Sequence, residues 1–112
     1  MLNSVTLVGR LTKDPEVSIN KKTKKSRCFI TLAVGRTYKN ADGEYDADFI
    51  DVTVWDGLAD NLAEYCKKGD LIGLRGRIET NSYDDENGNM RKSTVVIAEK
   101  ITYLTSKKEE DK

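Results

Sequence analysis

Residues 47–55 read ADFIDVTVW, and this stretch decides the fold that the sequence predicts. Its strict alternation predicts a β-strand whose isoleucine and two valines face a core, while Phe49 and Trp55 face the other way. A β-branched core face is ordinary, but two large rings on the opposite face need a partner. They contact either another part of the protein, or another subunit, or a flat ligand, and nucleic-acid bases stack on such rings. We expect bases, and a protein contact stays open as the alternative.

The composition is that of one globular domain. The chain has 112 residues, of which 38% are hydrophobic and 34% charged, and this length suits a single core. No apolar run approaches the roughly 20 residues that a membrane-spanning helix needs, and the first residues lack the basic and apolar regions of a signal peptide. We therefore expect a cytoplasmic protein with no membrane contact.

The sequence lacks the residues of the common metal and nucleophile sites. It contains no histidine and only two cysteines, Cys28 and Cys66, which form no Cys-x-x-Cys pair. Histidine-dependent triads and the usual zinc sites are thereby excluded. Cys28 falls in a predicted strand and Cys66 late in a predicted helix, so we expect both to be small core residues. We expect no metal, no cofactor and no enzymatic activity.

The charged residues are segregated along the chain. The formal net charge is zero, which by itself argues against a polyanionic ligand. Residues 1–40, however, contain nine Lys and Arg against two acids, and residues 41–66 contain eight acids and no base. A protein whose charges cancel overall but are segregated along the chain in this way can still form a basic groove.

The order of the predicted elements is that of a small all-β barrel. Strand patterns cover residues 4–11, 26–38, 47–55, 70–83 and 91–104. Pro15 cannot donate to a ladder, so it marks a bend beyond which residues 16–19 resume the first strand. A helix at residues 56–69 lies between the third and fourth strands. This is the order of the OB-fold, a five-stranded Greek-key barrel whose second and third strands and adjacent loops commonly bind oligonucleotides or oligosaccharides. We assign residues 1–104 to this domain and residues 105–112 to a charged, flexible tail.

Several motifs together resemble a known family. They are VTLVGRLTKDPE at residues 5–16, the strands at 29–38 and 47–55, LAEYCKKGD at 62–70, GRI at 76–78 and VVIAE at 95–99. In this order they resemble bacterial single-stranded DNA-binding proteins. The resemblance implies an OB-fold, a homotetramer, and non-catalytic, sequence-independent binding of single-stranded DNA in replication, recombination and repair, in the cytoplasm at the nucleoid.

The resemblance also implies which side chains stack on bases. The family's aromatic platforms match Trp55, Phe49, Tyr38 and Tyr83. Stacking tolerates every base and is worth roughly 1–3 kcal/mol per base. Three or four such rings therefore suffice for tight binding without any contact to base edges.

Cations on strand faces and in turns are the candidate phosphate contacts. Arg75 and Arg77 come first, because they have the outward parity of the fourth strand. The others are Arg36, Lys39, Lys13, Lys22, Lys24 and Lys92. The lysine-rich turn at residues 21–25 is either a solvated hairpin tip or a phosphate contact, and both interpretations stay open.

Two features of the sequence depart from a simple match. Many bacterial members continue through a long linker to an acidic tip that recruits repair and replication enzymes, whereas this chain ends in KKEEDK. We therefore expect a short form, natural or shortened, without recruitment through the tail. Asp48 and Asp51 are predicted beside the rings, where a polyanion is repelled, and the sequence does not explain them. The alternatives are an OB-fold interaction module that binds a protein or its own subunits, and a binder of RNA or oligosaccharides.

Overall fold

The computed structural model describes residues 2–105. The expectation of a flexible tail concerns residues 105–112, so nearly all of it lies outside the described part. Along the chain the elements are β1 (Val5–Leu11), β2 (Val17–Ile19), β3 (Ser26–Lys39), β4 (Tyr45–Trp55), α1 (Asp56–Tyr65), β5 (Leu71–Asp84) and β6 (Met90–Tyr103). The predicted resumption of the first strand beyond Pro15 is confirmed as β2, and the predicted third, fourth and fifth strands are β4, β5 and β6.

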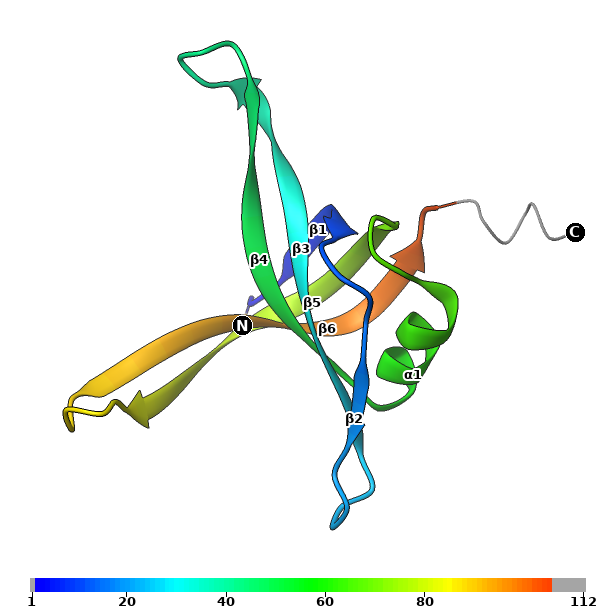
Figure 1. The fold of residues 1–112 in the computed structure, drawn as a ribbon, viewed down its shortest axis with the longest axis vertical. Helices are drawn as coiled ribbons and strands as arrows, with labels where there is room; N and C mark the ends of the chain where they lie inside the picture. Colours follow the sequence, from blue (N-terminus) through cyan, green and yellow to red (C-terminus); the bar gives the residue numbers. More distant parts are fainter. Residues whose placement is uncertain (1, 106–112) are drawn as a thin grey trace, which may run out of the picture.

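The strands close into a mixed barrel with the predicted topology. The strand order is β1-β5-β6-β4-β3-β2, and β1 also pairs with β3 through Arg10 and Leu11, which closes the sheet (Figure 1). All pairings are antiparallel except that of β4 with β6. Gly9 allows the crossing of β1 over β3, because a Cβ there would lie 2.7 Å from the Ala33 carbonyl oxygen. The OB-fold prediction is confirmed, with the helix between β4 and β5.

The core follows the alternation of β3 and β4. Cys28, Ile30 and Leu32 of β3 are buried opposite Val52 and Val54 of β4. Leu62 of α1 is fully buried and closes one end of the barrel. One polar residue departs from the alternation: Thr53 is buried because β6 pairs with β4 at this point.

The helix is shorter than the sequence predicts. It ends at Tyr65, and the peptide N–H of Cys66 makes the last bond to the Leu62 carbonyl oxygen. The following turn is held by one tertiary and one local contact instead, since Gly69 donates to the Leu11 carbonyl oxygen and the Asp70 carboxylate accepts the Lys67 N–H. Within residues 2–105, no helix is long and apolar enough to span a membrane.

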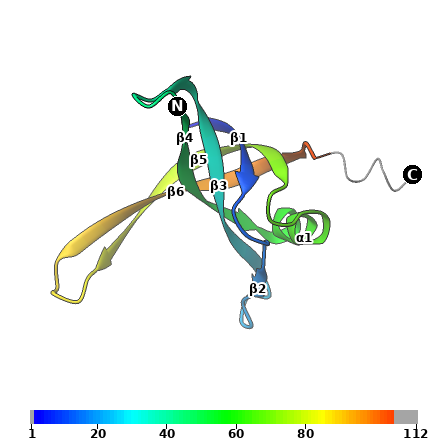
Figure 2. The same cartoon turned by 45° about the horizontal axis from the view of Figure 1, so that its top comes forward.

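Three hairpin arms project from the barrel in different directions (Figures 1 and 2). The β2–β3 arm has its turn at residues 20–25, the β3–β4 arm at residues 40–44 and the β5–β6 arm at residues 85–89. On the last arm β5 has left the barrel, so Ile78, which the alternation places in the core, is 44% exposed. The arms and the outer faces of the strands that carry them present most of the predicted functional side chains.

Candidate nucleic-acid interface

The outer face of the β3–β4 ribbon carries the two rings that the alternation singles out. The register places Arg27 opposite Trp55, Phe29 opposite Thr53, Thr31 opposite Asp51 and Ala33 opposite Phe49. Residues opposite each other in an antiparallel pair point to the same side. Phe49 is 68% exposed and Trp55 39%. The predicted outward orientation of both rings is confirmed.

Arg27 and Phe29 join these rings, and neither was among the predicted site residues. The Arg27 guanidinium carbon lies 4.7 Å from the centre of the Phe29 ring and 5.5 Å from that of Trp55. A guanidinium at this distance is attracted to the electron-rich ring faces. The spacing of Arg27 and Phe29 along one strand signals a shared face, but their proximity to Trp55 depends on the β3–β4 register.

A pocket of about 370 Å³ opens beside Trp55, between the base of the β2–β3 arm and the start of α1. Its wall combines one aromatic side chain, two cations, two hydroxyls and one carboxylate. The lining residues are Ser18, Ile19, Asn20, Thr23, Lys25, Arg27, Trp55 and Asp56. The size and mixed character suit a ligand that has both a flat apolar part and a charged part.

A second groove, of about 340 Å³, connects the β3–β4 face to the β5–β6 arm. It brings Lys13 beside Phe29, with Thr31, Asn81 and Ser93 along its wall. Among the predicted cations outside the turn at residues 21–25, Lys13 therefore shares a groove with an exposed ring of the ribbon.

The two unexplained acids both have partners. Asp48 accepts hydrogen bonds from Arg36, with 2.8 Å from Nη2 to Oδ1, and lies on the opposite side of the ribbon from Phe49, its neighbour in the strand. Asp51 accepts a hydrogen bond of 2.9 Å from the Thr31 hydroxyl. The Arg36 hydrogen bond lowers the pKa of Asp48, and Asp48 in turn raises the pKa of Arg36. The charge of Arg36 is thus matched by Asp48 before any phosphate arrives.

The β3–β4 arm presents its own rings near its tip. Tyr38 and Tyr45 are exposed, and the Lys39 ammonium lies 5.7 Å from the centre of the Tyr45 ring. A register shift interrupts the ladder between Gly35 and Lys39, in the stretch that contains Tyr38. Tyr45, on the same ribbon, is a second ring that the sequence prediction omitted.

Arg75 and Arg77, the first-ranked candidates for phosphate contacts, have different surroundings. Arg77 donates hydrogen bonds of 2.6 Å to Glu79 and 3.3 Å to Glu99. These hydrogen bonds raise the pKa of Arg77, and the one to Glu79 has the larger effect. Arg75 lines a groove with Val8 and Leu104, and none of the four predicted rings lines that groove. The structure therefore does not bring Arg75 together with the rings, and it surrounds Arg77 with carboxylates.

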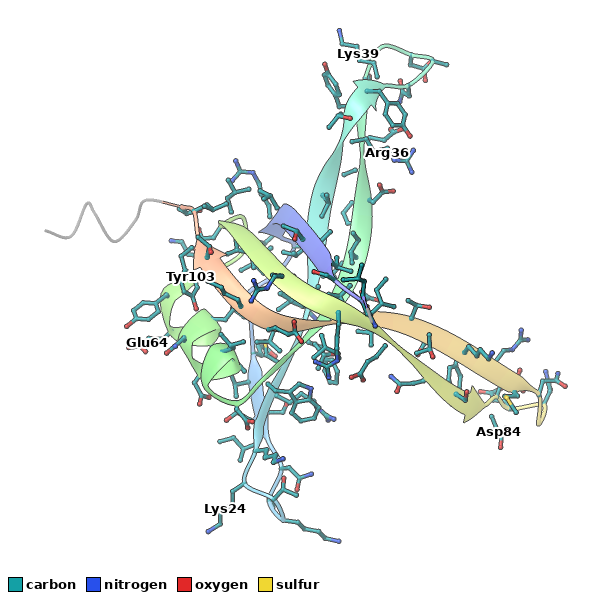
Figure 3. The ribbon with its side chains drawn as sticks, turned by 180° about the vertical axis from the view of Figure 1, so that it is seen from behind. Lys24, Arg36, Lys39, Glu64, Asp84 and Tyr103 are labelled. Carbon is teal, nitrogen blue, oxygen red and sulfur yellow. The ribbon has the colours of Figure 1, made fainter. Side chains whose placement is uncertain are left out.

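The remaining predicted residues lie on the arms. Tyr83 is exposed on the β5–β6 arm, where Lys92 lies opposite Ser82. Lys22 and Lys24 lie in the turn of the β2–β3 arm. Figure 3 shows Lys24, Lys39 and Asp84 near the ends of three different arms.

The cysteines and acids form neither a metal-binding cluster nor a disulfide in the part of the chain that the structure describes. No group of three or more Cys, Asp or Glu is arranged to hold a metal ion there. Cys28 is buried, which raises the pKa of its thiol, and no disulfide joins it to Cys66. Burial of Cys28 agrees with the prediction of a core residue.

Comparison with known proteins identifies similar chains. The family described as the single-strand binding protein family matches residues 2–104. The chain is 44% identical over 108 residues to single-stranded DNA-binding protein 1 of Clostridium acetobutylicum, covering 96% of this chain and 98% of that protein. It is 44% identical over 110 residues to single-stranded DNA-binding protein B of Bacillus subtilis, covering 98% and 96%. Over 107 residues it is 47% identical to the single-stranded DNA-binding protein of Streptococcus pneumoniae, covering 96% of this chain and 68% of that one.

Proposed function

The chain belongs to the single-strand binding protein family, and we propose that it binds single-stranded DNA and protects it during replication, recombination and repair. The observation that carries the proposal is the row of exposed rings on the outer face of β3 and β4, namely Phe29, Phe49 and Trp55. Each ring offers a platform to any base, so binding through these rings is tolerant of sequence. The protein acts by binding and not by catalysis, in the cytoplasm at the nucleoid.

We assign base stacking to exposed rings and phosphate contacts to cations around them. The stacking residues are the four predicted rings, Trp55, Phe49, Tyr38 and Tyr83, together with Phe29 on the same face as Phe49 and Trp55. Among the cations, the surroundings of Lys13, Lys22, Lys24, Lys39 and Lys92 support the assignment better than those of Arg36, Arg75 and Arg77. Arg36 and Arg77 already face carboxylates, and Arg75 lies in a groove without rings.

Titration with oligo-dT tests this function directly. Trp55 is the chain's only tryptophan, so stacking on it should quench the protein's tryptophan fluorescence. Substitution Trp55→Ala should weaken binding, measured by anisotropy of labelled oligo-dT, by about 1–3 kcal/mol. Leu2→Ala, which removes another exposed apolar side chain, is the matched control and should bind normally.

Two outcomes of this titration count against the proposal. Absence of binding at low salt contradicts it, as does an affinity that the loss of Trp55 leaves unchanged. If Trp55→Ala unfolds the protein, Phe49→Ala, at a more exposed ring, carries the same test. If the face serves only protein or subunit contacts, added oligonucleotide should neither bind nor quench Trp55 fluorescence.

We further infer that the protein assembles as a homotetramer. Among the described residues, Val5 to Gly9 of β1 pair with β5 only, so the other edge of this segment is open. An open edge is a template for pairing with another chain. Apolar side chains next to it, Val8 and Leu104, are about half exposed. Light scattering of the protein alone should give four times the chain mass, and a monomer mass at working concentration would contradict this assembly.

A further inference from the structure

The pocket beside Trp55 brings together an aromatic ring, two cations and a carboxylate in one cavity. We propose that it is a nucleotide subsite in which Arg27 and Lys25 hold a phosphate, Trp55 stacks on the base, and Asp56 selects bases that carry an amino group. This inference rests on the proposed binding of single-stranded DNA and adds to it a local preference for cytosine, adenine or guanine over thymine.

Arg27 is the arginine best placed to receive a phosphate. In the described part of the chain Arg36, Arg77 and Arg91 each form an ion pair with a carboxylate, whereas Arg27 forms none. Its guanidinium is held over two rings, which fixes the position of the group and leaves the N–H donors at its edge for a ligand. A planar fork of donors matches two oxygens of a phosphate.

The β2–β3 arm reinforces this preference for an anion. Residues 18–27 contain five cations and no acid. Lys25, from the same arm, lines the pocket together with Arg27. A phosphate bound here would therefore meet two cations at close range and three more at the tip of the arm, and no carboxylate of that arm opposes it.

The wall of the pocket also carries a carboxylate. Asp56 lines the pocket, yet within residues 2–105 it forms no ion pair with Lys25 or Arg27 and accepts no side-chain hydrogen bond. Cations and carboxylate thus face one cavity without neutralising each other. A ligand that has an anionic group and also hydrogen-bond donors can pair with both the cations and the carboxylate, and a nucleotide with an amino-bearing base is such a ligand.

The chemistry of the base edges sets the preference. A carboxylate accepts hydrogen bonds from the amino groups of cytosine, adenine and guanine. Thymine has no amino group and presents carbonyl oxygens, which a carboxylate repels. Stacking on Trp55 brings the base edge to a wall of the same cavity, so Asp56 can read it while the other platforms remain tolerant of sequence.

Trp55 fluorescence reports occupancy of this pocket, because its ring forms part of the wall. For Arg27→Gln we expect the oligonucleotide concentration that half-quenches Trp55 to rise about five-fold or more, the effect of removing one charged hydrogen-bond partner. The matched control is Lys100→Gln, which removes one charge from the groove that Arg75 lines. The control should shift the midpoint only slightly.

The base preference is tested by the ratio of affinities for oligo-dC and oligo-dT of equal length. Substitution Asp56→Asn should lower the dC-to-dT ratio by about three- to ten-fold, because the amide offers thymine a donor that the carboxylate lacks. Asp60→Asn makes the same charge change on the exposed side of α1 and should raise both affinities alike, leaving the ratio unchanged.

The outcomes separate this subsite from the general function. An unchanged ratio in Asp56→Asn, or equal midpoints in Arg27→Gln and Lys100→Gln, overturns the subsite while binding through the other rings stands. If the unmodified protein binds neither oligonucleotide, the proposed function and the subsite fail together. Circular dichroism of each variant establishes that the barrel is folded before the affinities are compared.

Discussion

The β2–β3 arm and the β5–β6 arm are hairpins of the same barrel, and they differ in what surrounds their cations. Residues 18–27 contain five cations and no acid, and residues 77–92 contain three cations and four acids. On the β5–β6 arm Arg77 meets Glu79 and Glu99, and Arg91 meets Asp85. On the β2–β3 arm the described cations form no ion pair, and Arg27 lies on rings. An exposed cation therefore favours a polyanion only insofar as its charge is not already matched.

In the turns of both arms, a side-chain oxygen accepts two backbone N–H groups, but the side chain is an amide in one turn and a carboxylate in the other. In the β2–β3 turn the Asn20 side-chain oxygen accepts the N–H groups of Lys22 and Thr23. In the β5–β6 turn an Asp85 oxygen accepts those of Asn87 and Asn89. An amide oxygen accepts equally well at every pH, whereas protonation of a carboxylate removes its charge and weakens it as an acceptor.

The largest effect is expected at the base of the β5–β6 arm. In Gly76→Ala the new Cβ would overlap the Ile97 carbonyl oxygen, where the β5–β6 register shifts. We expect a loss of stability of about 2 kcal/mol or more, measured by thermal unfolding. Gly35→Ala, on the β3–β4 arm, meets no atom within 4 Å and serves as the control. Equal melting temperatures for the two variants would show that the close approach at Gly76 is not a constraint.

The salt dependence of binding separates the two arms next. Replacing Lys22 and Lys24 by Gln should reduce the slope of log K against log salt by about 0.7 for each phosphate that these lysines neutralise. Arg77→Gln should leave the slope nearly unchanged, because two carboxylates already match its charge. Equal reductions would mean that the ion pairs of Arg77 open when DNA binds.

The smallest effect is a pH dependence confined to the β5–β6 turn. The hydrogen bond from Arg91, followed by the turn N–H groups, lowers the pKa of Asp85. A lowered folded-state pKa stabilises the turn above the ordinary carboxyl pKa of about 3.9, and this contribution is lost as pH falls through the lowered value. NMR titration should show the Asn87 and Asn89 amides shifting with Asp85, and Arg91→Gln should raise that pKa. The Lys22 and Thr23 amides should stay unchanged; a parallel shift there would contradict the assigned roles of Asn20 and Asp85.

Local patterns predicted most of the fold. The alternation around Phe49 and Trp55 predicted which face each ring takes, and Pro15 predicted the break between β1 and β2. The prediction of the helix was wrong at its C-terminal end. The helix ends at Tyr65, because the residues that follow bond elsewhere: Gly69 to Leu11 of β1, and Asp70 to Lys67 within the turn. The alternation of β5 would also place Ile78 in the core with Ile72 and Leu74, but Ile78 is exposed, because alternation cannot tell where a strand leaves the barrel.

The sequence by itself determined the barrel, its element order and the outward direction of its rings, since these depend on side-chain periodicity and on turn residues close along the chain. Tertiary structure alone decided which cations remain available. Arg27 reaches Trp55 through the β3–β4 register, and Arg77 reaches Glu99 through the β5–β6 register. Electrostatic matching depends on distances across strands, and residues far apart in sequence acquire those distances only when the barrel closes.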